Sequence, residues 1–157
     1  MSVLEVTFRT KEAAGAIAAI KREVPEAVLG AGTLLAPQMV KDAKAAGAVF
    51  GVAPGFDPAV MAAAKEAGLP MCPGIATASE LSQALTAGCE MVKFFPAEAA
   101  GGVKMIKNLL GAFRFAGVKF MPTGGGVRGL SPTVSYKIGH DFVAVSDMSC
   151  NCAYVQI

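Results

Sequence analysis

Lys93 stands inside an apolar stretch, between Val92 and Phe94, of the kind that is typical of a strand buried on both faces. The stretch contains no acid that could pair with it. Burial disfavours the ammonium form, so the pKa of a buried lysine falls, to roughly 5–6 in extreme cases. A neutral amine in an apolar site can attack a ketone and form a Schiff base. The alternative is a lysine at a strand edge whose charged end reaches solvent past its neighbours.

A second set of polar residues, Glu5, Thr7 and Arg9, occupies every second position near the start of the chain. In a strand such residues share one face, which would bring a carboxylate and a guanidinium together. A glutamate inside an apolar strand needs a partner as much as Lys93 does. The alternatives are an exposed first strand for Glu5 and a simple helix start for Arg9 and Thr10.

Strands and helices are predicted to alternate along the chain. The predicted strands cover residues 3–8, 27–30, 49–53, 69–72, 91–95, 118–121 and 142–145, and the predicted helices cover residues 11–23, 37–47, 58–67, 79–87 and 103–110, several of them ending at a glycine. A spacing of roughly 20–27 residues between strands indicates stacked βα units and a parallel sheet.

Seven βα units are visible, whereas a (β/α)₈ TIM barrel has eight and typically ~200–250 residues. The 157 residues therefore predict one α/β domain, residues 1–157, that is either an open sheet or a TIM barrel truncated at its N-terminus.

Function in such a barrel lies at the C-terminal ends of the strands. Gly124, Gly125 and Gly126 follow the sixth predicted strand, where backbone N–H groups could cradle a phosphate. The alternative is a flexible turn. Lys119 is a rival for Lys93, but it lies at the start of its strand and hence toward the opposite end of the barrel.

Composition excludes several other classes of protein. No apolar run approaches the roughly 18 residues of a membrane span, and a net charge of +2 from scattered Lys and Arg does not predict nucleic-acid binding. The four cysteines and single histidine have no metal spacing, and Cys150 and Cys152 are interpreted as free thiols rather than a redox pair. A strand pattern at the very start leaves no room for a signal peptide, which predicts the cytoplasm.

Six motifs resemble, in order and spacing, those of the 2-keto-3-deoxy-6-phosphogluconate (KDPG) and 4-hydroxy-2-oxoglutarate aldolases. They cover about residues 3–126 and read LEVTFRT (4–10), GAGT (30–33), APG (53–55), PGIAT (73–77), KFFPAE (93–98) and PTGG (122–125). The resemblance implies a trimeric class I aldolase on a TIM barrel, a lyase of the Entner-Doudoroff pathway that uses neither metal nor cofactor. It would cleave KDPG to pyruvate and glyceraldehyde 3-phosphate, with 4-hydroxy-2-oxoglutarate, giving pyruvate and glyoxylate, as a further candidate substrate.

The resemblance also implies a role for individual residues. Lys93 would form the Schiff base, and Glu5 would be the general acid and base. The other implied contacts are Arg9 and Thr33 with the carboxylate, Pro54 and Phe95 along the pocket, and Thr123, Gly124 and Gly125 with the distal hydroxyls and phosphate.

The two ends of the chain depart from the family pattern. The family has a further strand and helix before the LEVT motif, and it closes its phosphate site with a Gly-Gly-Ser loop. Here the corresponding region offers Ser146 or Ser149 in place of that serine, with Asp147 between them, and the tail from Arg128 is interpreted as diverged. The alternative function is a catalytically impaired remnant that acts as an oligomeric scaffold, because an incomplete barrel exposes strand edges that another chain would cover.

Overall fold

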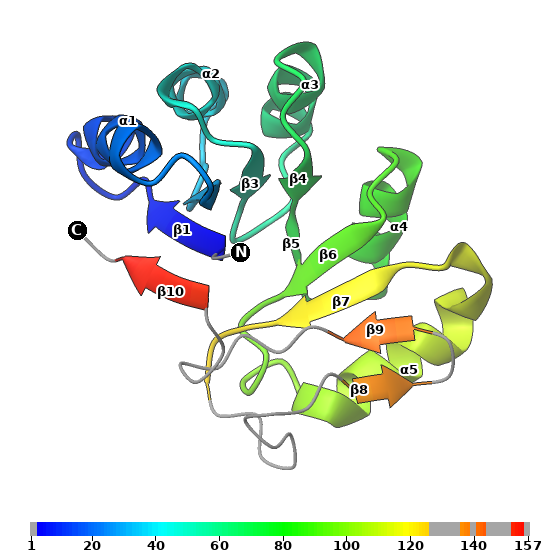
Figure 1. Cartoon of the computed structure of the whole chain (residues 1–157). Coiled ribbons are helices and arrows are strands. Elements are labelled where there is room, and N and C mark those ends of the chain that lie inside the picture. The colour runs from blue at the N-terminus through cyan, green and yellow to red at the C-terminus, as the bar shows by residue number, and fades with distance from the viewer. Residues whose placement is uncertain (1–2, 126–135, 139–140, 144–151, 156–157) are drawn as a thin grey trace.

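The computed structural model describes residues 3–125, 136–138, 141–143 and 152–155 of the chain. Its elements, in order, are β1 (Val3–Thr7), α1 (Ala13–Glu23), β2 (Val28–Gly32), α2 (Pro37–Ala46), β3 (Phe50–Val52), α3 (Pro58–Glu66), β4 (Met71–Cys72), β5 (Gly74–Ile75), α4 (Ala78–Thr86), β6 (Met91–Phe94), α5 (Gly102–Phe113), the 3₁₀ turn η1 (Arg114–Ala116), β7 (Lys119–Pro122), β8 (Tyr136–Ile138), β9 (Asp141–Val143) and β10 (Cys152–Val155). Figure 1 shows the strands at the centre with the helices around them. The predicted α/β alternation is confirmed.

Local sequence explains where most helices begin and end. Pro37 and Pro58 each occupy the first turn of a helix, where a missing N–H costs nothing. The Asp57 carboxylate accepts hydrogen bonds from the first N–H groups of α3, and Thr77 and Glu80 form a reciprocal capping box at the start of α4. Gly47 ends α2 in the left-handed conformation at φ 107°.

One predicted helix end was wrong. We expected the fifth helix to stop at Gly111, but α5 continues to Phe113 and η1 follows it as far as Gly117. Leu110 and Phe113 pack against the apolar core on either side of that glycine. Their burial outweighs the roughly 1 kcal/mol by which glycine disfavours a helix interior.

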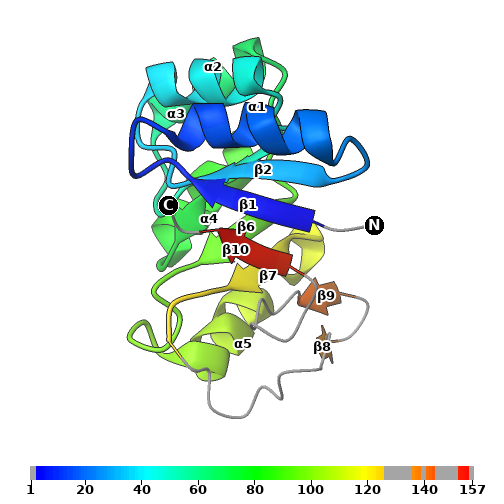
Figure 2. The same ribbon diagram turned by 60° about the vertical axis from the view of Figure 1, so that its left-hand side comes forward.

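The strands form two hydrogen-bonded sheets, parallel except for β8, and Figure 2 shows β10 beside β1. Hydrogen bonding gives the orders β10-β1-β2-β3-β4 and β5-β6-β7-β9-β8. β4 and β5 are two halves of one strand path, divided at Pro73, which has no N–H to donate. All seven predicted strand positions are present, the last as Asp141–Val143, with residues 144 and 145 outside the described part.

Two described strands in the tail, β8 and β10, were not predicted. β8 pairs antiparallel with β9, and β10 pairs parallel with β1, from Val3 opposite Cys152 to Val6 opposite Val155. The described residues therefore contain eight parallel strand positions. The alternative of an exposed first strand does not hold on this side of β1, because its hydrogen-bonding groups are paired with β10.

The apolar core lies between the strands and the helices rather than inside the ring of strands. One cluster joins β1 and β2 to α1, α2 and α3, and includes Val6 and Leu29. The other joins β5, β6 and β7 to α4 and α5, and includes Phe94 and Phe120. Because side chains alternate along a strand, the residues next to these core positions point to the inner face. No helix of the described residues is long and apolar enough to cross a membrane.

Candidate active site

Lys93 lies on the inner face of β6. Val92 and Phe94 pack beneath α4 and α5, so alternation directs the lysine between them away from that core. The Lys93 N–H donates to the Pro73 carbonyl at 2.8 Å, which fixes this point of β6 against the neighbouring strand. The Nζ atom lies 5.0 Å from the centroid of the Phe95 ring.

Glu5 lies on the inner face of β1, since the next residue, Val6, is fully buried in the first core cluster. Its carboxyl group rests over the backbone of β2. A β-carbon on Gly32 would overlap Oε1 of Glu5, and one on Gly30 would overlap the Phe50 ring. These two glycines therefore leave the space that the carboxyl and the ring occupy.

The charges of Lys93, Glu5 and Arg9 act on one another, although β1 ends at Thr7 and Arg9 lies exposed beyond the strand whose face it was predicted to share. Burial lowers the pKa of Lys93 below its usual 10.5; Glu5 and Cys72 oppose this change, and Arg9 reinforces it. Burial raises the pKa of Glu5 above 4.5, opposed by Lys93 and Arg9. The pKa of Lys93 thus changes in the direction that the sequence predicted, and Arg9 contributes as expected.

Lys93 and Glu5 interact electrostatically without direct contact. In the part of the chain whose side chains are described, the ion pair within 4 Å is Arg22 with Glu23, on the surface of α1. The two candidate catalytic groups come from β6 and β1, far apart in sequence, and face the same interior.

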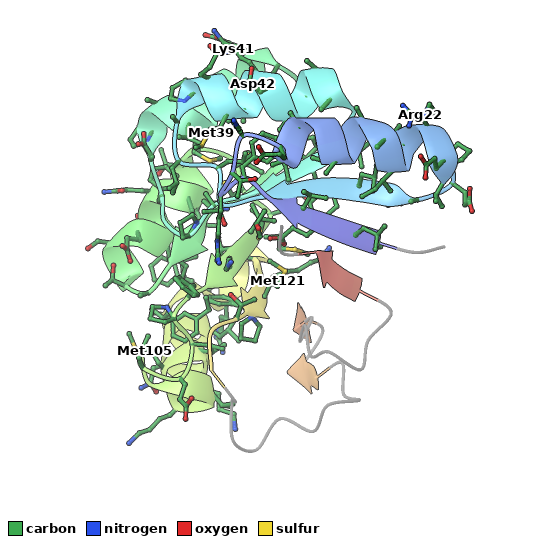
Figure 3. All side chains as sticks on the ribbon, turned by 90° about the vertical axis from the view of Figure 1, so that its left-hand side faces the viewer. Arg22, Met39, Lys41, Asp42, Met105 and Met121 are labelled. Carbon is green, nitrogen blue, oxygen red and sulfur yellow. The ribbon has the colours of Figure 1, made fainter. Side chains whose placement is uncertain are left out.

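Sequence reasoning missed Cys72, which lies beside these groups. Its side chain is only 8% exposed, and burial raises the pKa of its thiol to about 12. Electrostatic coupling to both Lys93 and Glu5 places it on the inner face. The pattern of alternation in the fourth predicted strand could have indicated this, because the neighbouring Met71 packs toward the helices. Met121 of β7, labelled in Figure 3, pairs in register with Lys93 on the next strand.

Arg9 and Thr33, the predicted carboxylate ligands, follow β1 and β2. Arg9 is exposed and lines a cavity of about 290 Å³ together with Met39 and Asp42 of α2, both labelled in Figure 3. Thr33 has a left-handed backbone at φ 61°, which a β-branched residue rarely adopts. Such strain persists where the surroundings hold the residue in place, and it is most common at functional sites.

Pro54 and Phe95, the predicted pocket residues, are both half-buried and follow β3 and β6. The Pro54 carbonyl lies against Gly74, where a β-carbon would overlap it. The Phe95 ring covers Gly124 in a similar way, with a hypothetical β-carbon there 2.8 Å from the ring. The loop after β6 therefore packs against the loop after β7.

The loop after β7 carries the predicted contacts to the distal end of the substrate. Thr123 donates its N–H to Phe94 at 3.0 Å, and the Glu98 N–H donates to the Gly124 carbonyl at 3.1 Å. Gly124 and Gly125 have φ values of 88° and 97°. The Thr123 hydroxyl is buried without a hydrogen-bond partner in the described residues.

Two features complicate the predicted phosphate site. The Glu98 carboxylate approaches Gly125 so closely that a β-carbon there would overlap it, which places an acid beside the glycine loop. Ser146, Ser149 and Asp147 lie outside the described residues.

Two further features, Lys119 and a second hollow, bear on where the site lies. Lys119 is exposed at the start of β7, as expected, and pairs in register with Met91 at the start of β6, two residues before Lys93. A larger hollow, of about 790 Å³, lies between α3 and α4 and is lined by residues such as Met61, Leu69 and Met91 near the start of β4 and β6. It lies away from Lys93 and Glu5, so we do not regard it as the site of the chemistry.

The chain is similar to a family of known proteins. A sequence model described as "KDPG and KHG aldolase" matches residues 1–147. The chain belongs to this family. The "KHG/KDPG aldolase" of Escherichia coli (strain K12) is 45% identical over 148 residues, which are 94% of this chain and 65% of that protein. The "2-dehydro-3-deoxy-phosphogluconate aldolase" of Treponema pallidum is 51% identical over 122 residues, 78% of this chain and 57% of that protein.

Solved KDPG aldolase structures share the fold. The KDPG aldolase of Legionella pneumophila, solved with pyruvate captured as a covalent carbinolamine intermediate, is 42% identical with a TM-score of 0.75, over 80% of this chain and 60% of that one. The KDPG aldolase of Zymomonas mobilis ZM4, solved with 3-phosphoglycerate, gives a TM-score of 0.74 at 42% identity. This chain therefore spans somewhat less than two thirds of the length of these KDPG aldolase relatives.

Proposed function

We propose that the protein is a class I aldolase that cleaves 2-keto-3-deoxy-6-phosphogluconate to pyruvate and glyceraldehyde 3-phosphate. The observation that carries the proposal is that Lys93 and Glu5 both lie on the inner face of the strands and interact electrostatically. Burial lowers the pKa of the amine and raises the pKa of the carboxyl. An amine that loses its proton easily and an acid that keeps its own are the two groups that Schiff-base formation needs.

In the proposed reaction the neutral Lys93 amine adds to the C2 ketone, and loss of water leaves a cationic imine. Glu5 takes the proton from the C4 hydroxyl, and the C3–C4 bond breaks with its electrons flowing toward the imine. The aldehyde leaves, the resulting enamine is protonated at C3, and hydrolysis releases pyruvate and regenerates the amine. Arg9 both anchors the carboxylate and, by its positive charge, favours the neutral form of Lys93.

The remaining residues are proposed to bind the rest of the substrate. Thr33 holds the carboxylate with Arg9, and Pro54 and Phe95 line the pocket around the reacting carbons. The distal hydroxyls and phosphate are assigned to Thr123, Gly124 and Gly125, with Ser146 as a further contact. The buried, unpartnered hydroxyl of Thr123 supports this assignment, because a buried hydroxyl is normally hydrogen-bonded.

We further propose 4-hydroxy-2-oxoglutarate as a second substrate, which is supported by the name of the E. coli relative. A homotrimer is the proposed assembly. One structural neighbour is a cage described as made by fusing symmetric oligomeric domains, although only 27% identical. Light scattering would give three times the 16.0 kDa chain mass for a trimer. The cytoplasmic location and the single-domain organisation stay predictions.

Borohydride trapping tests the proposed function. The protein is incubated with pyruvate, reduced, and mapped by peptide mass spectrometry, with Lys119→Met as a matched control and Lys93→Met as the test variant. An N-(1-carboxyethyl) adduct on Lys93 in the wild type and in Lys119→Met, absent from Lys93→Met, is expected. Folded wild-type protein that gives no adduct would refute the aldolase and favour the impaired scaffold.

A further inference from the structure

Thr7 is a buried polar residue without a partner on the face that carries Glu5. It is 7% exposed and is the one polar or charged residue among the fully buried side chains that the structure describes. Its Oγ1 has no hydrogen-bond partner in the same part of the chain. A buried hydroxyl left unsatisfied costs about 1–3 kcal/mol, so an unpartnered one at this position calls for an explanation.

The register of β1 and β2 places this hydroxyl beside the Glu5 carboxyl. Thr7 is opposite Gly32, and Glu5 is opposite Gly30, one pleat earlier. The Glu5 side chain nevertheless extends to Gly32, where its Oε1 occupies the space of the missing β-carbon. The carboxyl therefore lies at the level of Thr7, on the side of the neighbouring strand. Oγ1 of Thr7 makes no direct hydrogen bond to it, so a substrate oxygen bound by both groups would give the hydroxyl its missing partner.

We propose that Thr7 is a second catalytic residue beside Glu5: the Thr7 hydroxyl and the Glu5 carboxyl together hold the C2 oxygen of the 2-keto acid while that oxygen leaves as water. This inference rests on the proposed aldolase function. It assigns to Thr7 a role distinct from carboxylate binding, which Arg9 and Thr33 supply further along the same strand ends.

The step balances as follows. Addition of the Lys93 amine to the C2 carbonyl, with proton transfer from nitrogen to oxygen, gives a neutral carbinolamine. The Glu5 carboxylic acid then protonates the C2 hydroxyl, the C2–O bond breaks, and water departs. The nitrogen lone pair forms the C=N bond, which leaves a cationic imine and a Glu5 carboxylate. Thr7 gives no proton away; it donates a hydrogen bond to the departing oxygen and holds it in line with the Glu5 proton.

Two substitutions at Thr7 separate the hydroxyl from the shape of the side chain. Thr7→Val keeps the volume and removes the hydroxyl, whereas Thr7→Ser keeps the hydroxyl. The readout is the exchange of the pyruvate methyl hydrogens for deuterium, followed by NMR, because exchange requires the imine to form. Thr86→Val, which removes an exposed hydroxyl at the end of α4, is the control.

We expect Thr7→Val to slow the maximal exchange rate by about 10–100-fold, with the pyruvate concentration at half-maximal rate changed by less than about threefold. Thr7→Ser and Thr86→Val should stay within about threefold of wild type. The melting temperature of Thr7→Val should equal or exceed that of wild type, because an unsatisfied hydroxyl is replaced by a methyl group. Loss of rate without loss of stability separates a catalytic role from a structural one.

Wild-type exchange in Thr7→Val, or equal slowing in Thr7→Ser and Thr7→Val, would overturn the proposal. A failure of the proposed function looks different: the wild type itself would then give neither exchange nor a borohydride adduct on Lys93. In that case the proposed role of Thr7 would be refuted together with the proposed aldolase function.

Discussion

The carboxyl of Glu5 rests on the backbone of Gly32, in the space that the β-carbon of any other residue would take. This contact sets the height of the carboxyl along the barrel axis, because Glu5 starts one pleat lower, opposite Gly30. Gly32 lies in a regular strand and its φ is not in the left-handed region. The glycine is therefore required by the close approach of a side chain and not by its own backbone.

Gly32→Ala should consequently impair the chemistry. The new methyl group displaces the Glu5 carboxyl, and we expect pyruvate exchange to fall by about tenfold or more. Gly15→Ala in α1 is the matched control: its β-carbon meets nothing within 4 Å, and the change should stabilise the helix by about 0.5–1 kcal/mol. The measurement is deuterium exchange of the pyruvate methyl group in both variants, together with their melting curves. A Gly32→Ala variant that exchanges at the wild-type rate would contradict the assigned position of the Glu5 carboxyl.

Glu5→Gln should raise stability at neutral pH. Because the folded pKa of Glu5 lies above its ordinary value, its contribution to stability is fully present below pH 4.5 and is lost as pH rises through the folded pKa. The glutamine cannot ionise and escapes that loss. Thermal melts at pH 4 and pH 7 should therefore show little difference at pH 4 and a more stable variant at pH 7, while exchange activity falls.

An exposed carboxylate provides the control for this pH dependence. Glu26→Gln, in the loop before β2, should show the same difference in melting temperature between pH 4 and pH 7 as the wild type. A Glu5→Gln variant no more stable than wild type at pH 7 would mean that the positive charges of Lys93 and Arg9 outweigh the burial of the carboxyl.

Replacing Arg9 by Met should alter both binding and pH dependence. Adduct formation needs the neutral Lys93 amine, so its rate rises with pH through the Lys93 pKa, which Arg9 helps to lower. Without the guanidinium that pKa rises, and the ascending limb of the trapping rate moves to higher pH. Pyruvate affinity should fall by about 10–100-fold, since a charge-assisted hydrogen bond is lost. Arg9→Lys keeps the charge, so its trapping rate should rise with pH over nearly the same range as in wild type. If the rate in Arg9→Met also rises over the wild-type pH range, the effect of the Arg9 charge on the Lys93 pKa is refuted.

Thr33→Asn should stabilise the protein and weaken its binding of pyruvate. Thr33 holds a left-handed backbone at φ 61°, a conformation that asparagine tolerates far better than a β-branched residue. We expect a gain of about 1 kcal/mol in the free energy of unfolding, measured by urea denaturation, with weaker pyruvate binding because the hydroxyl is gone. A variant that binds pyruvate as tightly as wild type would remove Thr33 from the proposed carboxylate site.

Much of the fold followed from local sequence rules. The alternation of strands and helices, the helix starts at Pro37 and Pro58 and the stop at Gly47 were predicted correctly, because each depends on residues close together in the chain. The helix end predicted at Gly111 was wrong because the apolar contacts of Leu110 and Phe113 come from distant elements, and these contacts outweigh the local tendency of glycine to end a helix. The pairing of β10 with β1 was not predictable for a similar reason, since no local pattern says which distant strand a short segment will join.

The sequence by itself determined which residues could do chemistry, because a lysine or glutamate within an apolar strand is conspicuous without knowledge of its neighbours. Only the tertiary structure decided that Lys93 and Glu5 face one interior, and that Cys72 lies there with them. Strand order and register fix those relations, and they arise from hydrogen bonds between segments far apart in the chain. The pKa changes of the two catalytic candidates follow from the same packing, since burial and neighbouring charge exist only once the strands have come together.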